Sequence, residues 1–180
     1  MTSLSSSEMN TLARWPRLAA AVVLAAALGA AQTRQEALAR LKAGAAALDK
    51  GDSAAAARLL GPLPEQLPAI ADYAAFLLAQ AEAQNKRYAA VAPALEPVWR
   101  VSPVSPLAGR AAVLAARSLL EIGEAQKALL TLARTPAARL PQPQAGLLEA
   151  RAQEGAGDPV AAAARHQFVY FGYPTADEAK

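Results

Sequence analysis

The sequence predicts an all-α fold made of about four helical hairpins stacked in order, and three observations lead to this prediction. Hydrophobic residues make up 54% of the 180 positions, which is enough for a packed core and too many for intrinsic disorder. Much of this share is alanine, which favours helix and lets helices approach closely. Glycine and proline return at intervals instead of clustering in linkers, so they divide the chain into similar units.

Helix-breaking and small residues return in register along the chain. Turn positions follow one another at intervals of 34 to 37 residues and are Gly51, Lys86, Gly123 and Gly157. Seven residues before each turn stand the small residues Gly44, Ala79, Ala116 and Ala150. Five residues after it stand Ala56, Val91, Ala128 and Ala162, and nine residues after it Leu60, Leu95, Leu132 and His166. Small residues let two antiparallel helices cross closely, and one hairpin cannot bury its apolar face alone, so successive hairpins should stack.

The first hairpin illustrates how single helices are predicted. Thr33 and Glu36 have the spacing of a capping box, so a helix should begin at Arg34. The glycine at position 51 should end this helix. A second helix should then run over residues 53–60 and close a hairpin with a very short turn.

The first 31 residues have the pattern of a secretory signal. Residues 1–17 are polar and include two arginines, and the run 18–31 is apolar and ends in small residues. We expect cleavage near Ala31–Gln32, which leaves a repeat domain over residues 32–180. The alternative is an uncleaved membrane anchor, but the apolar run is shorter than the about 20 residues that a spanning helix needs. The sequence therefore predicts a bacterial protein that is periplasmic or secreted.

At the repeated positions the chain resembles the tetratricopeptide-repeat family, whose period is about 34 residues. The residues that carry the resemblance are Gly44, Gly51, Ala56 and Pro68 in the first unit and Gly157, Ala162 and Pro174 in the last. The resemblance covers residues 34–174 and implies a right-handed α-solenoid of about four hairpins. The bulky Trp and Tyr of the family's first helix are replaced by residues such as Arg40 and Ala47. Pro93 and Pro97 fall inside the second helix of the second unit, which should be kinked or shortened.

A second resemblance is carried by the segment Gln-Phe-Val-Tyr-Phe-Gly-Tyr-Pro at 167–174 and the Asp-Glu-Ala at 177–179. It is similar to a stretch of soluble lytic murein transglycosylases, periplasmic enzymes with a long helical superhelix before their catalytic domain. The stretch over 103–117 has a similar character. This resemblance implies a cell-wall setting and a scaffolding role. The catalytic motif of that family is absent, because no Glu-Ser pair supplies the acid glutamate.

The end of the sequence repeats the spacing seen near its start. Thr175 and Glu178 form a second capping-box pattern, so a helix should open at Ala176 and stop at Lys180 after one turn. Four aromatic residues precede it, Phe168, Tyr170, Phe171 and Tyr173. Repeat arrays need a polar cap at each end, so we expect the repeat domain to be truncated here. The alternative is a natural tail with the aromatic side chains folded inward.

No group of residues has the pattern of a catalytic, cofactor or metal site. Cysteine is absent, and His166 is the single histidine, at a place held by leucine in other units, where partial burial is expected. Glu121 and Glu124 should share a helix face, as paired carboxylates do in glycosidases, but Arg117 and Lys127 can neutralise them. The sequence therefore predicts no enzyme activity of its own, no cofactor and no bound metal.

The charge pattern points to protein or glycan partners. The 18 basic and 15 acidic residues nearly balance, and the arginines are scattered, which argues against nucleic acid. Stacked hairpins form a concave groove that can hold a protein, a peptide or a glycan strand. Tyr88 and Trp99 could line it or fill the gap around the prolines. Two functions stay open, a scaffold forming the N-terminal part of a lytic transglycosylase and a stand-alone adaptor; membrane contact is expected only through an uncleaved signal.

Overall fold

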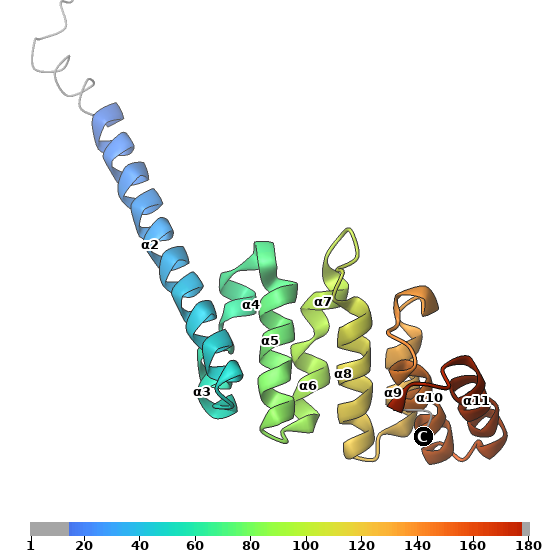
Figure 1. Cartoon of the computed structure of the whole chain (residues 1–180). Coiled ribbons are helices and arrows are strands. Elements are labelled where there is room, and N and C mark those ends of the chain that lie inside the picture. The colour runs from blue at the N-terminus through green and yellow to red at the C-terminus, as the bar shows by residue number, and fades with distance from the viewer. Residues whose placement is uncertain (1–14, 178–180) are drawn as a thin grey trace, which may run out of the picture. The chain divides into compact units, whose positions relative to one another are not determined.

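The computed structural model describes residues 15–177, with the backbone alone for 15–31 (Figure 1). All regular structure in this part of the chain is helical, which confirms the predicted all-α class. The chain divides into two compact units, residues 1–39 and 40–180. Within the first unit, the described residues belong to helix α2 (Trp15–Asp49), whose last ten residues lie in the second unit.

Helix α2 is continuous, and this corrects one prediction. It runs from Trp15 to Asp49, so no helix begins at Arg34 and Thr33 does not cap a helix start. The residues around this point are compatible with a helix interior, and neither proline nor a turn separates them from the alanine-rich run before them. Part of the predicted signal, residues 1–14, lies outside the described residues. Among the residues that are described, no helix is both long enough and apolar enough to cross a membrane.

The second unit consists of helical hairpins that follow one another in chain order (Figure 1). The end of α2 pairs with α3 (Ser53–Leu60), which confirms the helix predicted over these residues. The second, third and fourth hairpins are α5 (Ala71–Gln84) with α6 (Tyr88–Ala94), α8 (Ala108–Glu121) with α9 (Ala125–Ala133), and α10 (Gln144–Gly155) with α11 (Pro159–Gly172). Short helices α4 (Leu63–Gln66), η1 (Pro68–Ile70), α7 (Glu96–Arg100) and η2 (Ala137–Arg139) occupy the connections.

Each hairpin turn has the same backbone conformation. The residues with positive φ in the described part of the chain are Gly51 (77°), Lys86 (58°), Gly123 (76°) and Gly157 (84°). The third turn shows the hydrogen bonds: Gly123 N–H donates to the carbonyl of Leu120 at 3.0 Å, and Glu124 N–H to that of Leu119 at 2.9 Å. This pair of bonds is the Schellman motif, which satisfies the last carbonyls of a helix and needs a left-handed residue.

The proline-rich second hairpin confirms the predicted disturbance. Helix α6 ends at Ala94, and α7 begins at Glu96 after Leu95. Pro93 lies in the last turn of α6 and Pro97 in the first turn of α7. Pro97 has no N–H to donate, and its ring clashes with the preceding turn, so a continuous helix cannot form. The break leaves two short helices where the third hairpin has one, α9.

The second helix of each hairpin packs against the first helix of the next. Helix α3 contacts α5, α6 contacts α8, and α9 contacts α10. One core joins the second and third hairpins through Val91, Leu95, Val98, Ala108, Ala111 and Ala115. Another joins the third and fourth through Ala112, Ala128, Leu132, Ala145, Leu148 and Ala152. Alanines on α8 and α10 let these helices approach, while larger aliphatic residues such as Val91 on α6, Leu132 on α9 and Leu148 on α10 fill the space between them.

Two helix positions have room only for glycine. One lies against a buried leucine, and the other lies against the backbone of a neighbouring segment. A Cβ atom on Gly44 would lie 2.7 Å from the side chain of Leu60, which is fully buried. A Cβ atom on Gly109 would overlap the carbonyl oxygen of Arg139 and lie 2.9 Å from its carbonyl carbon. These contacts fix how closely α3 approaches α2 and how closely η2 approaches α8.

Candidate binding cleft

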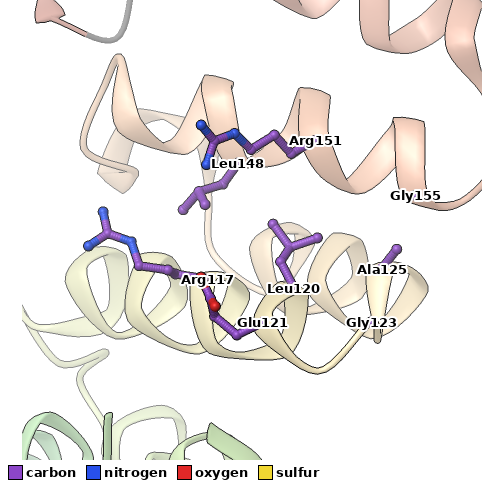
Figure 2. Close-up of a pocket in the computed structure, with 8 residues that line it drawn as sticks. All are labelled: Arg117, Leu120, Glu121, Gly123, Ala125, Leu148, Arg151 and Gly155. Carbon is purple, nitrogen blue, oxygen red and sulfur yellow. The ribbon is translucent and has the colours of Figure 1, made fainter. Parts of the chain in front are cut away.

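A cleft of about 520 Å³ lies between the third and fourth hairpins (Figure 2). It is bounded by the end of α8, the start of α9 and one face of α10. The residues that line it are Arg117, Leu120, Glu121, Gly123, Ala125, Leu148, Arg151 and Gly155. The cleft therefore follows from the stacking of two hairpins and does not belong to one helix alone.

The floor of the cleft is apolar. Leu148 and Ala125 are buried, and Leu120 is half-buried. At one end of the cleft, the end of α10 lies close to the start of α9. A Cβ atom on Gly155 would lie 2.9 Å from the Cβ of Ala125. An apolar side chain of a partner would gain free energy by covering the exposed part of Leu120.

Two exposed arginines flank this floor. Arg117 on α8 and Arg151 on α10 both extend toward the same end of the cleft, away from Gly123 and Gly155, with Leu148 between them in the view of Figure 2. Each stands six residues before the turn glycine of its hairpin, so the two occupy equivalent places in successive repeats.

The same place in the first and second hairpins holds Ala45 and Gln80, which carry no charge. The cationic pair is therefore confined to the third and fourth hairpins. It does not result from the repeat itself, because the repeat needs only small residues at the neighbouring core position.

Neither arginine of the cleft has a carboxylate partner among the described residues. Three other arginines of the described residues are paired, among them Arg165, whose Nη2 lies 2.7 Å from Glu149 Oε1 on the other side of α10. Glu121 stands one turn after Arg117 at the rim of the cleft and also makes no ion pair within the described part of the chain. Two guanidinium groups are thus free to bind an anionic ligand.

Glu121 and Glu124 do not share a helix face, which corrects the prediction from the sequence. Glu121 is the last residue of α8, whereas Glu124 lies beyond the Gly123 turn and precedes α9, so they share no helix face. Lys127 binds Glu124, with Nζ 2.9 Å from Oε1, and does not neutralise Glu121. The arrangement therefore lacks the facing carboxylates that glycoside hydrolysis requires.

The repeat positions singled out from the sequence serve packing and turns. Gly44, Ala56, Ala128 and Ala162 are buried between helices, whereas Gly51, Gly123 and Gly157 form turns. Of these seven, Gly123 also lines the cleft. His166 is partly exposed on α11, with Nε2 3.1 Å from Glu154 Oε1. In the described residues, no three His, Cys, Asp or Glu side chains converge as metal ligands would.

Trp99 fills the gap at the proline break and lies outside the cleft. It packs against the cores on both sides of the third hairpin, and its Nε1 donates to Thr135 Oγ1 at 3.4 Å. The guanidinium of Arg134 lies 4.4 Å above its ring and binds Glu96 through two bonds of 2.7 and 3.2 Å. The hydrogen bond from Arg134 lowers the pKa of Glu96. Tyr88 starts α6, is half-buried, and does not line the cleft either.

The aromatic residues of α11 form a separate exposed surface. Phe168, Tyr170 and Phe171 are 46%, 59% and 75% exposed, so the alternative with these rings folded inward does not hold. The helix that was expected to open at Ala176 lies mostly outside the described residues.

Comparisons with known protein families, curated proteins and solved structures gave no match. The chemistry available to the cleft must therefore be argued from its own residues. These offer two guanidinium groups, one carboxylate and an apolar floor, and they lack a nucleophile with an adjacent base. Such a set can bind a ligand that has anionic and apolar groups.

Sequence reasoning missed the cleft. Arg117 was assigned to neutralise acidic residues, and the arginines as a set were read as scattered. The signal that could have found the site is positional, because Arg117 and Arg151 stand at the same place in consecutive repeats. Nothing in the chemistry of the two residues alone sets them apart from other surface arginines.

Proposed function

We propose that this chain is a non-catalytic helical-repeat scaffold that binds a partner through the first helices of its hairpins. The observation that carries the proposal is the cleft between α8 and α10, where unpaired cations flank an apolar floor. Binding sites combine such apolar surface with a few polar groups that fix orientation. A protein or peptide segment supplies both kinds of group.

A right-handed α-solenoid is the architecture that we propose for the hairpins. Two findings support it: the turns share one conformation, and each second helix packs against the next first helix. In a solenoid each repeat contacts only its neighbours, and the first helices line an extended surface for a partner. The cleft then lies on that surface, between two consecutive repeats.

The bacterial envelope is the setting that we propose. It is supported by the signal pattern over residues 1–31 and by the similarity of 167–174 to soluble lytic murein transglycosylases. In the first version, the chain is the N-terminal scaffold of such a cell-wall enzyme. In the second, it is a stand-alone adaptor for other proteins.

Export and partner binding are tested in two steps. The full chain, expressed in a Gram-negative host, should appear in the periplasmic fraction with Gln32 as its new N-terminus, as N-terminal sequencing would detect. A photo-crosslinking residue at Leu120 should then give a discrete complex that the same residue at Leu59, on the surface of α3, does not give. Cytoplasmic retention would refute the export proposal, and identical crosslinks from both positions would refute the binding role of the cleft.

Binding to isolated peptidoglycan sacculi separates the two versions. We expect weak or no retention, because the cleft offers guanidinium groups and few acceptors for sugar hydroxyls. Saturable tight retention that is lost in an Arg117→Gln, Arg151→Gln double variant would favour the glycan strand over the protein partner.

A further inference from the structure

We infer that the occupant of the α8–α10 cleft is an acidic peptide segment of a partner protein, bound in extended form with one carboxylate on Arg117 and another on Arg151. This inference rests on the proposed scaffold function and names the chemistry of its partner. It is argued from the unpaired charges, the spacing of the two helices and the floor between them.

The charges select carboxylates. A guanidinium group presents a planar fork of donors that matches a carboxylate, and charge-assisted bonds of this kind are stronger than neutral ones. Both guanidinium groups lie at the surface without an ion pair in the described residues, so a ligand need not displace an internal partner. Arg134 and Arg165 could not serve in this way, because Glu96 and Glu149 already bind them.

The spacing selects a peptide over a single small anion. Arg117 and Arg151 start from equivalent places on α8 and α10, and packed helices lie about 8–10 Å apart. An extended peptide advances about 3.3 Å per residue and its side chains alternate between two faces, so carboxylates at positions i and i+4 point to the same side and are about 13 Å apart. Two acidic residues with three others between them therefore match the two guanidinium groups, because the arginine side chains can extend outward from their helices.

The floor and the rim add further selectivity. Leu148 lies between the two arginines in the view of Figure 2, and Leu120 lies toward Gly123. Both suit an apolar side chain at position i+2, which points to the same side as the two acidic residues. Glu121 at the rim repels a third carboxylate on its side, so a uniformly acidic run binds less well than two separated acidic residues. The same carboxylate argues against nucleic acid, which needs a continuous cationic track.

The test measures fluorescence anisotropy with the whole chain and two labelled, amidated peptides. One peptide is Ser-Gly-Glu-Ala-Leu-Ala-Glu-Gly-Ser, and the matched peptide carries Gln in place of both Glu. We expect the Glu peptide to bind at least about tenfold more tightly at low salt, given the strength of charge-assisted bonds reduced for exposure. Its affinity should fall as salt is added, because exposed charges are screened.

The matched variants carry the same loss of charge at different places. Arg117→Gln with Arg151→Gln should weaken the Glu peptide by about tenfold or more. Arg40→Gln with Arg58→Gln removes two exposed arginines of the first hairpin and should leave the affinity within about twofold, since these are far along the chain from the cleft. All four arginines are exposed, so circular dichroism and the Tm should be unchanged in both double variants.

The outcomes separate this inference from the proposed function. If the intact chain binds the Glu peptide no better than the Gln peptide, the inference is overturned. A discrete crosslink from Leu120 would still support the scaffold function in that case. If both double variants weaken binding equally, the effect is one of net charge, and the cleft is not the site. Should the Arg117, Arg151 variant lose its fold, the salt dependence of the intact chain and the two-peptide comparison decide.

Discussion

In the second and the third hairpin, the first helix contacts the segment that leads into the next hairpin. The contact is at the same repeat position in both, but the interacting groups differ. At the start of α5, Asp72 accepts a 2.6 Å hydrogen bond from Oγ of Ser105, which leads into the third hairpin. At the start of α8, Gly109 takes the equivalent place, 14 residues before the turn. It lies directly against the backbone of Arg139, which leads into the fourth hairpin. One contact is a side-chain hydrogen bond, and the other is a backbone approach.

This difference teaches that one packing requirement of a repeat can be met by unrelated residues. A hydrogen bond survives if another acceptor replaces the first, whereas a close backbone approach excludes every side chain. We therefore expect the third hairpin to be the less tolerant of the two at this place. The same comparison extends to the turns, Lys86 against Gly123, and to the ion pair that links the two hairpins.

The largest effect is expected for Gly109→Ala. The new Cβ would overlap the Arg139 carbonyl, and no rotamer change can relieve a clash between backbones, so we expect a loss of about 3 kcal/mol or more. This loss exceeds the gain of about 1 kcal/mol that alanine brings to a helix. Urea denaturation measures the free energy of unfolding. Gly172→Ala in α11, where nothing lies within 4 Å, is the control and should be neutral or slightly stabilising. Equal values for both variants would show that the approach of η2 to α8 is not tight.

The equivalent change in the second hairpin, Asp72→Ala, should cost about 1–2 kcal/mol. Ser105 is buried, and its hydroxyl also accepts from the N–H of Leu107, so the loss leaves a buried donor without its acceptor. Asp72→Asn keeps an acceptor oxygen and should recover most of the stability. If the alanine and asparagine variants unfold at the same urea concentration, the hydrogen bond to Ser105 contributes nothing measurable.

The turns could be predicted from the sequence because glycine and small residues recur in register. Register alone predicted Lys86 as a turn residue, since lysine has no preference for positive φ. The helix start predicted at Arg34 is wrong, because the prediction rested on a local pattern. The pattern of Thr33 and Glu36 is local, and a capping box has no effect where the preceding residues are themselves helical.

The cleft could not be predicted, because its residues come from helices that meet only through packing. Lys127 binds Glu124 and not Glu121, because α8 ends at Glu121 and the Gly123 turn places Glu124 next to the start of α9. The arginines at 117 and 151 become a pair only when α10 lies beside α8. Sequence reasoning supplies the candidates, and the arrangement of the hairpins decides which of them face the same space.

Lys86 and Gly123 form the next comparison, with effects of about 1 kcal/mol in opposite directions. A side chain at positive φ costs about 1–2 kcal/mol, which glycine avoids, so Lys86→Gly should stabilise the chain by up to about 1 kcal/mol. Gly123→Ala should destabilise it by a similar amount, through backbone strain alone, since nothing lies within 4 Å of its Cβ position. Thermal unfolding followed by circular dichroism measures both. A destabilising Lys86→Gly would mean that the lysine side chain makes a contribution larger than its strain.

The smallest effect concerns the ion pair between the second and third hairpins, and it depends on pH. Arg134 holds the pKa of Glu96 below its ordinary value of 4.5, so the pair stabilises the fold above that pH. The contribution is lost as the pH falls through the lowered pKa of the folded state, where Glu96 becomes protonated. Both side chains are about 40% exposed, so we expect less than about 1 kcal/mol.

Glu96→Gln isolates the contribution of the Glu96–Arg134 ion pair, because every other carboxylate titrates alike in the unaltered chain and in the variant. The stability difference between the unaltered chain and the variant should be largest at pH 7 and should shrink toward pH 3. A difference that stayed constant over this range would assign the role of residue 96 to packing beside Trp99, where the guanidinium of Arg134 stacks, and not to its charge. At this place the aromatic contact, and not the ion pair, would then add to the apolar core that joins the second and third hairpins.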